Sequence, residues 1–408
     1  MGLKRFLGEG GDLRLGCSGW SYSDWVGPFY EREIGMLAQY TKVFRTVEID
    51  STFYSLPPPR LVEGWARRTP ADFVFTAKLP RQITHKRLLK GGDPSTELQQ
   101  FLKLMEPLRL RGKLGPLLVQ LPPGFDYTKV GALEDLLNLL PKGWQFAVEF
   151  RHPSWLEHDE VWQLLERYGV AYTIVDEPLL PPLVKVTTSK FTYVRWHGHG
   201  ERPWYNYFYR EEELKPWVPR IQQLLKEVDV VYGFFNNHFH AYAVANCLQM
   251  LKFLGYITPQ QERVLAKVLE HLATKPRIRP TLAEAKGAEP FDVLVARNDV
   301  EGMLAYFMDE KRLRRAKEIP DKEVVVEEAD ETGIHARIRT YTIIIDLENR
   351  EILHDCADWS RVSAAGQFCK HVGKLFLSIP VQQAIAILTD LYHQRDSWLL
   401  RPLIGEEA

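Results

Sequence analysis

The first part of the chain alternates short β-rich runs with stretches of helical period, and this alternation limits the fold more than any other feature. Alternating βα units build a parallel sheet that helices cover. Eight such units in roughly 250 residues match the size of a closed (β/α)₈ barrel. The eight β-rich runs begin at Leu13, Thr46, Phe73, Gly115, Gln145, Ala171, Phe191 and Val230. The sequence therefore predicts an α/β barrel.

The alternation of β-rich and helical segments ends at about residue 257. Residues 258–332 hold helical segments, prolines and a charged run from Asp309 to Thr332, which indicate a helical spacer and a solvated linker. Residues 333–408 open with a β hairpin and close with a helix from Pro380 to Leu391. We therefore predict a (β/α)₈ TIM-like barrel over residues 1–257, the spacer over 258–332, and a small ββα domain over 333–408.

Composition excludes several classes of protein. The 408 residues carry 52 Lys and Arg against 53 Asp and Glu, so any nucleic-acid contact requires a local basic patch. The start of the chain lacks the apolar core of a signal peptide, and no run of about 18 apolar residues occurs. Four cysteines are too few for a disulfide scaffold of this size. We expect a soluble, cytoplasmic protein with no membrane partner, and its oligomeric state stays open.

Charged residues lie within or at the ends of the predicted strands. Because barrel strands are covered outside and packed inside, such charges must point inward or sit at a strand end. In the run AVEFRH, side-chain alternation turns Glu149 and Arg151 toward the barrel mouth. The active sites of such barrels lie at the C-terminal ends of the strands. We interpret six residues as catalytic: Glu48, Lys78, Glu149, Arg151, Asp176 and His197. A balanced ion-pair network is the alternative.

The segment after the third predicted strand is cationic. Residues 78–92 include several basic side chains and no acidic one. This excess of positive charge favours a phosphate or carboxylate ligand over a merely solvated loop. Aromatic rings near the same rim are able to stack on bases or sugars, or to pack as core. The residues assigned to substrate binding are Trp20, Tyr54, Arg81, His85, Arg195, Asn236 and Asn237.

Ordered motifs resemble a known barrel family. The runs GCSGWSYSDWVGPFY, VEIDSTFYSLP, QLPP, VEFRHPSW, YVRWHG and FFNNH are similar to the blocks of the domain-of-unknown-function 72 family over about residues 13–254. The resemblance implies a TIM-like barrel whose polar mouth is comparable to that of metal-dependent apurinic endonucleases, without a settled reaction. A divalent metal in the mouth is one alternative. Without metal, Glu149 or Asp176 would act as base and His197 as acid, while the basic side chains stabilise a phosphate.

A Cys/His motif near the C-terminus predicts a zinc site. The runs HDCADW and FCKH suggest four ligands to one tetrahedral Zn²⁺, namely Cys356, Asp358, Cys369 and His371, with His354 as the alternative to Asp358. The segment resembles the SWIM zinc finger over about residues 339–376, with Asp358 in the place of a cysteine. That resemblance implies DNA or protein binding, to which Arg361, Lys370 and Lys374 would contribute.

The resulting functional hypothesis is a nucleic-acid-associated protein, with DNA favoured. Its barrel would hydrolyse a phosphodiester or process a damaged nucleotide, as in DNA repair, and its zinc finger would dock it onto DNA or a protein partner. Two alternatives stay open. One is a non-catalytic scaffold of a repair or recombination complex, and the other is a metabolite- or sugar-processing barrel enzyme.

Overall fold

A computed structural model describes residues 11–201, 203–274 and 289–403. The described chain forms two compact units. The first holds residues 11–20 and 25–271, and the second holds residues 21–24 and the described part of 272–405. The predicted barrel boundary at residue 257 thus lies within the first unit, because α9 (Pro259–Ala273) buries Leu265 and Val268, and Gln261 donates a hydrogen bond to the Val43 carbonyl.

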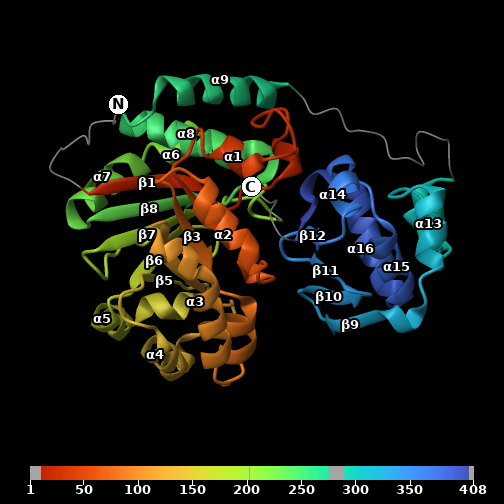
Figure 1. Cartoon of the computed structure of the whole chain (residues 1–408), viewed down its shortest axis with the longest axis horizontal. Coiled ribbons are helices and arrows are strands. Elements are labelled where there is room, and N and C mark those ends of the chain that lie inside the picture. Colours follow the sequence, from red (N-terminus) through yellow and green to blue (C-terminus); the bar gives the residue numbers. More distant parts are fainter. Residues whose placement is uncertain (1–10, 202, 275–288, 404–408) are drawn as a thin grey trace. The chain divides into compact units, whose positions relative to one another are not determined.

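An eight-stranded parallel sheet forms a nearly closed barrel in the first unit (Figure 1). Its order is β1-β8-β7-β6-β5-β4-β3-β2, and a bridge between Ser18 and Glu48 links β1 to β2. The strands are fully or largely buried, as expected for a parallel sheet covered by helices. The predicted α/β barrel is confirmed. Its strands are β1 (Asp12–Cys17), β2 (Thr46–Ile49), β3 (Val74–Lys78), β4 (Leu114–Gln120), β5 (Phe146–Glu149), β6 (Ala171–Asp176), β7 (Phe191–Trp196) and β8 (Val230–Phe235).

Helices connect and cover the strands. Each buries one apolar face, as α5 does with Val161, Trp162 and Leu165. No helix is assigned in the described chain between β6 and β7, where three prolines lie close together. The helices of this layer are α1 (Met36–Tyr40), α2 (Pro59–Arg68), α3 (Ser95–Leu110), α4 (Val130–Leu139), α5 (Asp159–Tyr168), α6 (Glu211–Leu214), α7 (Trp217–Glu227) and α8 (Tyr242–Leu254).

The second unit has a five-stranded sheet in the order β13-β12-β11-β10-β9. Its neighbours are antiparallel except β12 and β13. The strands are β9 (Val324–Ala329), β10 (Gly333–Ile338), β11 (Tyr341–Asp346), β12 (Glu351–His354) and β13 (Leu399–Pro402). The described helices are α11 (Phe291–Ala296), α12 (Val300–Leu304), α13 (Glu310–Lys317), α14 (Trp359–Val362), α15 (Lys370–Ser378) and α16 (Val381–His393).

The second unit is larger than the predicted ββα domain. The charged run from Asp309 to Thr332, predicted as a linker, contains α13 and β9. It folds because its few apolar residues pack inside the unit: Ala316 and Ile319 belong to the same buried cluster as residues of the sheet. Asp309 caps α13 by accepting a hydrogen bond from the Arg312 backbone. Among the described residues, no helix has the length and apolar character needed to cross a membrane.

Candidate functional site

A chain of buried ion pairs lies at the C-terminal ends of the barrel strands. We call Glu48, Glu149, Arg151, Glu177 and Arg195 the mouth cluster. The Arg195 guanidinium donates from Nη2 to Glu48 Oε1 at 2.7 Å and from Nη1 to Glu149 Oε2 at 2.8 Å. Arg151 Nη2 lies 2.6 Å from Glu149 Oε1, and its Nη1 donates to Glu177. The cluster therefore joins Glu48 of β2, Glu149 of β5 and Arg195 of β7 with residues just after β5 and β6 in one alternating series of charges.

Glu149 is a poor proton acceptor in this setting. Burial alone would raise its pKa, but the Arg151 and Arg195 guanidinium groups hold that pKa well below its usual range. A carboxylate so strongly stabilised in its charged form gains little from taking a proton. The structure therefore favours a role for Glu149 in holding the two arginines. This role differs from the predicted one, in which Glu149 is a general base.

His197 also departs from its predicted role. Its Nε2 lies 3.1 Å from Arg151 Nη2, and its Nδ1 lies 2.9 Å from the Asn236 amide nitrogen. Burial and the neighbouring Arg151 lower the pKa of His197 well below its usual value. The imidazole is thus neutral at physiological pH and has no imidazolium proton to donate. Its Nε2 faces the arginines, and its Nδ1 faces the amide group of Asn236.

Glu177, which sequence reasoning missed, takes the place predicted for Asp176. Strand pairing sets Val175 beside Arg195, so the inward series of β6 continues to Glu177. Asp176 points the other way, accepts a hydrogen bond from Trp217 Nε1 at 2.7 Å, and contacts His199. Burial raises the pKa of Glu177 although Arg151 opposes it. Its Oε1 has no hydrogen-bond partner among the described residues.

Two cations at the mouth lack an anionic partner in the described chain. Lys78 ends β3 with its amine 3.7 Å from the centre of the Phe53 ring, and burial together with Arg195 lowers the Lys78 pKa to about 8. Arg81 follows, and its buried Nε has no hydrogen-bond partner among the residues described. Burial, Lys78 and Arg81 lower the pKa of His85 to about 3, so this imidazole is neutral.

Tyr205, from the segment after β7, lies beside His197 at the barrel mouth. Its ring stacks on His238 and meets His197 edge-on, each with a centroid distance of 5.7 Å. Burial raises the Tyr205 pKa, so its phenol keeps its proton. Asn237 supports this segment by donating to the Tyr207 carbonyl at 2.8 Å. Of the predicted substrate-binding residues, Asn236 and Asn237 therefore hold other parts of the site in place.

Trp20 and Tyr54 both pack against other aromatic rings. The Trp20 ring packs against Trp65 of α2 at 5.3 Å and against Phe75 of β3 at 6.3 Å, and it is buried. Tyr54 packs on the edge of Phe53 at 5.2 Å. The structure therefore uses Trp20 for packing between sheet and helix and does not place it for stacking on a ligand.

The described residues provide a metal-ligand set in the second unit and not at the barrel mouth. In the mouth, each of Glu48, Glu149 and Glu177 is paired with at least one guanidinium group. Their positive charges oppose a cation at the same place. A divalent metal in the barrel is therefore not supported.

In the second unit, four buried side chains form the Cys/His cluster: His354, Cys356, Cys369 and His371. Their ligand atoms all lie within 4.8 Å of one another, and His354 Nε2 lies 3.4 Å from His371 Nδ1. Two nitrogens bound tetrahedrally to one Zn²⁺ are about 3.3 Å apart, so the cluster fits this ion. The Thr342 carbonyl lies 2.6 Å from His354 Nδ1 and leaves Nε2 for a metal.

The fourth residue of this cluster differs from the one predicted. His354, at the end of β12, takes the place predicted for Asp358, whose carboxylate accepts hydrogen bonds from Arg312 and Arg361. The basic patch expected nearby is also partly neutralised, because Arg361 pairs with Asp358 and Lys374 pairs with Asp321 at 2.6 Å. DNA docking through these residues gains no support.

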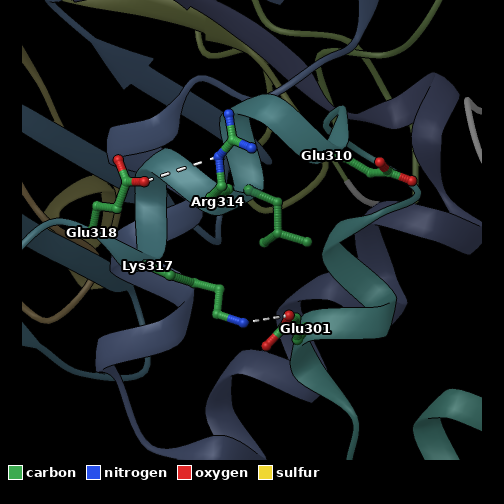
Figure 2. Close-up of a pocket in the computed structure, with 6 residues that line it drawn as sticks. Glu301, Glu310, Arg314, Lys317 and Glu318 are labelled. Carbon is green, nitrogen blue, oxygen red and sulfur yellow. Dashed lines mark hydrogen bonds and ion pairs between the residues drawn. The ribbon is translucent and has the colours of Figure 1, made fainter.

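A surface pocket of about 360 Å³ lies on α12 and α13 (Figure 2). Four of its five charged lining residues pair with one another, Lys317 with Glu301 at 2.7 Å and Arg314 with Glu318 at 3.9 Å. None of its lining residues belongs to the mouth cluster or to the Cys/His cluster. Exposed pairs of this kind are typical of a solvated face.

Comparison with known proteins identifies the family of the barrel. A family model described as "Protein of unknown function DUF72" matches residues 14–268. The UPF0759 protein YunF of Bacillus subtilis is 28% identical over 270 residues, covering 59% of this chain and 94% of YunF. The UPF0759 protein YecE of Escherichia coli K12 is 35% identical over 168 residues, covering 40% of this chain and 59% of YecE.

Solved structures agree with this assignment. A DUF72 family protein from Thermotoga maritima is 35% identical with a TM-score of 0.56, covering 60% of this chain and 99% of that chain. Another from Enterococcus faecalis is 26% identical with a TM-score of 0.52, covering 61% and 99%. This chain therefore belongs to the DUF72 family, proteins of unknown function.

Proposed function

We propose that the barrel mouth is the active site of an enzyme whose substrate carries a phosphate group. Lys78 and Arg81 bind the phosphate, and Glu177 exchanges a proton with the substrate. The observation that carries this proposal is the unpaired state of Lys78 and Arg81 among the described residues, beside arginines whose charges are already matched. Both side chains are partly buried, and a partly desolvated cation without an anionic partner is stabilised by an anionic ligand.

The balance of charge supports an anionic substrate. Three carboxylates, Glu48, Glu149 and Glu177, face four cations, because Lys78 and Arg81 add to Arg151 and Arg195. Burial raises the pKa of Glu177, and Arg151 opposes this shift. A carboxyl with a raised pKa next to ionised Glu149 gives the separation of pKa values that marks acid–base sites.

Arg81→Ala should weaken binding of inorganic phosphate by about 10- to 100-fold, because a charged hydrogen-bond donor to the anion is lost. Isothermal titration calorimetry on the full chain measures this. Lys90→Ala is the matched control, since Lys90 belongs to the same cationic segment but is exposed. Equal loss in both variants, or no phosphate binding to the unaltered protein, would overturn the phosphate site. Binding of a single-stranded oligonucleotide with the same Arg81 dependence would make nucleic acid the source of the phosphate.

We also propose that the Cys/His cluster holds a structural Zn²⁺. The fit of four buried ligands within 4.8 Å supports it, and a site with four protein ligands leaves no open position for a substrate. Metal analysis of the full chain should find one zinc per molecule. His354→Ala should lose it and Asp358→Asn should keep it, whereas the reverse would restore Asp358 as the ligand.

A further inference from the structure

We infer that the Lys78 amine forms a Schiff base with a carbonyl substrate, so that the barrel acts on aldehydes or ketones that carry a phosphate group. This inference rests on the proposed phosphate site and adds the reacting group. Lys78 stands at the C-terminal end of β3, in the rim where barrels of this kind place reacting groups. Its amine faces the Phe53 ring at 3.7 Å and has no carboxylate partner in the described chain.

Lys113, which is buried, shows that the arrangement of Lys78 is specific. The Lys113 amine donates to the Ala66 carbonyl at 2.9 Å, to the Thr69 carbonyl at 2.7 Å and to Thr69 Oγ1 at 3.2 Å. All three of its donor positions are used, so Lys113 caps the end of α2 and its amine is committed to these oxygens. Lys78 has no comparable set of acceptors in the described residues, which leaves its nitrogen available for reaction.

The charges around Lys78 favour its neutral form. Burial, Arg195 and Arg151 lower its pKa, while Glu149 and Glu48 oppose them, and the result is about 8. On the segment that follows β3, Arg81 adds a positive charge and His85 is neutral. At pH 7 about one amine in ten is then unprotonated, against roughly one in 3,000 for an ordinary lysine. Neighbouring cations in a desolvated pocket are a known means of activating a lysine nucleophile.

The step balances without an external oxidant or reductant. The neutral Lys78 nitrogen adds to the carbonyl carbon, and a proton passes from nitrogen to oxygen to give a carbinolamine. Glu177, whose pKa is raised, supplies a proton to the hydroxyl group, which leaves as water. The products are an iminium ion on Lys78 and an ionised Glu177. The phosphate of the substrate meanwhile pairs with Arg81, which orients the carbonyl group.

Trapping with pyridoxal 5′-phosphate and sodium borohydride tests the inference, with the modified lysines identified by peptide mass spectrometry. At pH 7 we expect Lys78 to react at least about ten times faster than the exposed Lys190, with a pH midpoint near 8. Lys113 should stay unmodified. Lys78→Arg should abolish the site-specific adduct, and inorganic phosphate should slow its formation.

Two failures of this experiment are distinguishable. If Lys78 reacts no faster than Lys190 while phosphate still binds with the expected Arg81 dependence, the Schiff base is excluded and the phosphate site stands. If Lys78 reacts quickly but neither phosphate nor Arg81→Ala changes its rate, the amine is a nucleophile and the proposed phosphate site is wrong.

Discussion

Cys369→Ser should remove the zinc and lower the melting midpoint of the second unit by at least about 10 °C. Cys369 is fully buried, directly precedes α15, and belongs to the same packed cluster as Cys356 and Trp359. Without the metal, His354 and His371 become buried polar groups with few partners, which costs further stability. Differential scanning calorimetry with hydrogen exchange on the full chain separates the two units.

Asp358→Asn is the matched control for this prediction. It alters a residue two positions from Cys356 and removes a charge that Arg312 and Arg361 share, yet it leaves all four members of the Cys/His cluster in place. We expect a change of less than about 1 kcal/mol, because these ion pairs are partly exposed. If a strong chelator and Cys369→Ser both leave the midpoint of the second unit unchanged, the metal has no structural role.

The barrel and most of its charged rim were predictable because the two-residue periodicity of a strand shows which of its side chains point inward. Alternation within AVEFRH and YVRWHG correctly paired Glu149 with Arg151 and Arg195 with His197. Asp176 was assigned to the mouth as the last residue of its strand and not by alternation, and this assignment was wrong. Pairing of Val175 with Arg195 sends Glu177 inward and Asp176 toward Trp217. Register depends on a neighbouring strand and cannot be read from one strand alone.

The metal ligands illustrate a different limit of sequence reasoning. Motif spacing favoured Asp358, but ligation depends on which side chains converge in space. The end of β12 brings His354 beside His371, where Thr342 of β11 orients its ring. Asp358 is taken by Arg312, 46 residues away in the sequence. Proton roles were equally hidden, because the pKa values of Glu149 and His197 follow from arginines on other strands.

Arg195→Met should destabilise the first unit by about 3–5 kcal/mol, the usual cost of removing one partner from a buried ion pair. Arg195 is 1% exposed and binds Glu48 and Glu149, both fully buried, so its loss leaves two carboxylates without that cation. Methionine replaces the aliphatic part of the arginine side chain, which keeps the cavity smaller than alanine would. Chemical denaturation at pH 7, followed by a signal assigned to the barrel, measures the change.

The pH dependence of this variant distinguishes lost charge pairing from poor packing. In the unaltered protein the depressed pKa of Glu149 contributes stability above its unfolded pKa, and this contribution is lost as pH falls through the folded pKa. Arg195→Met removes part of that contribution, so the stability difference between the two proteins should be largest near pH 7 and shrink as pH falls below about 4.5 toward the folded pKa of Glu149. Adding Glu149→Gln should recover part of the loss at pH 7 for the same reason. A difference independent of pH and unaffected by Glu149→Gln would mean that Arg195 acts through packing alone, and the electrostatic account of the mouth cluster would fall.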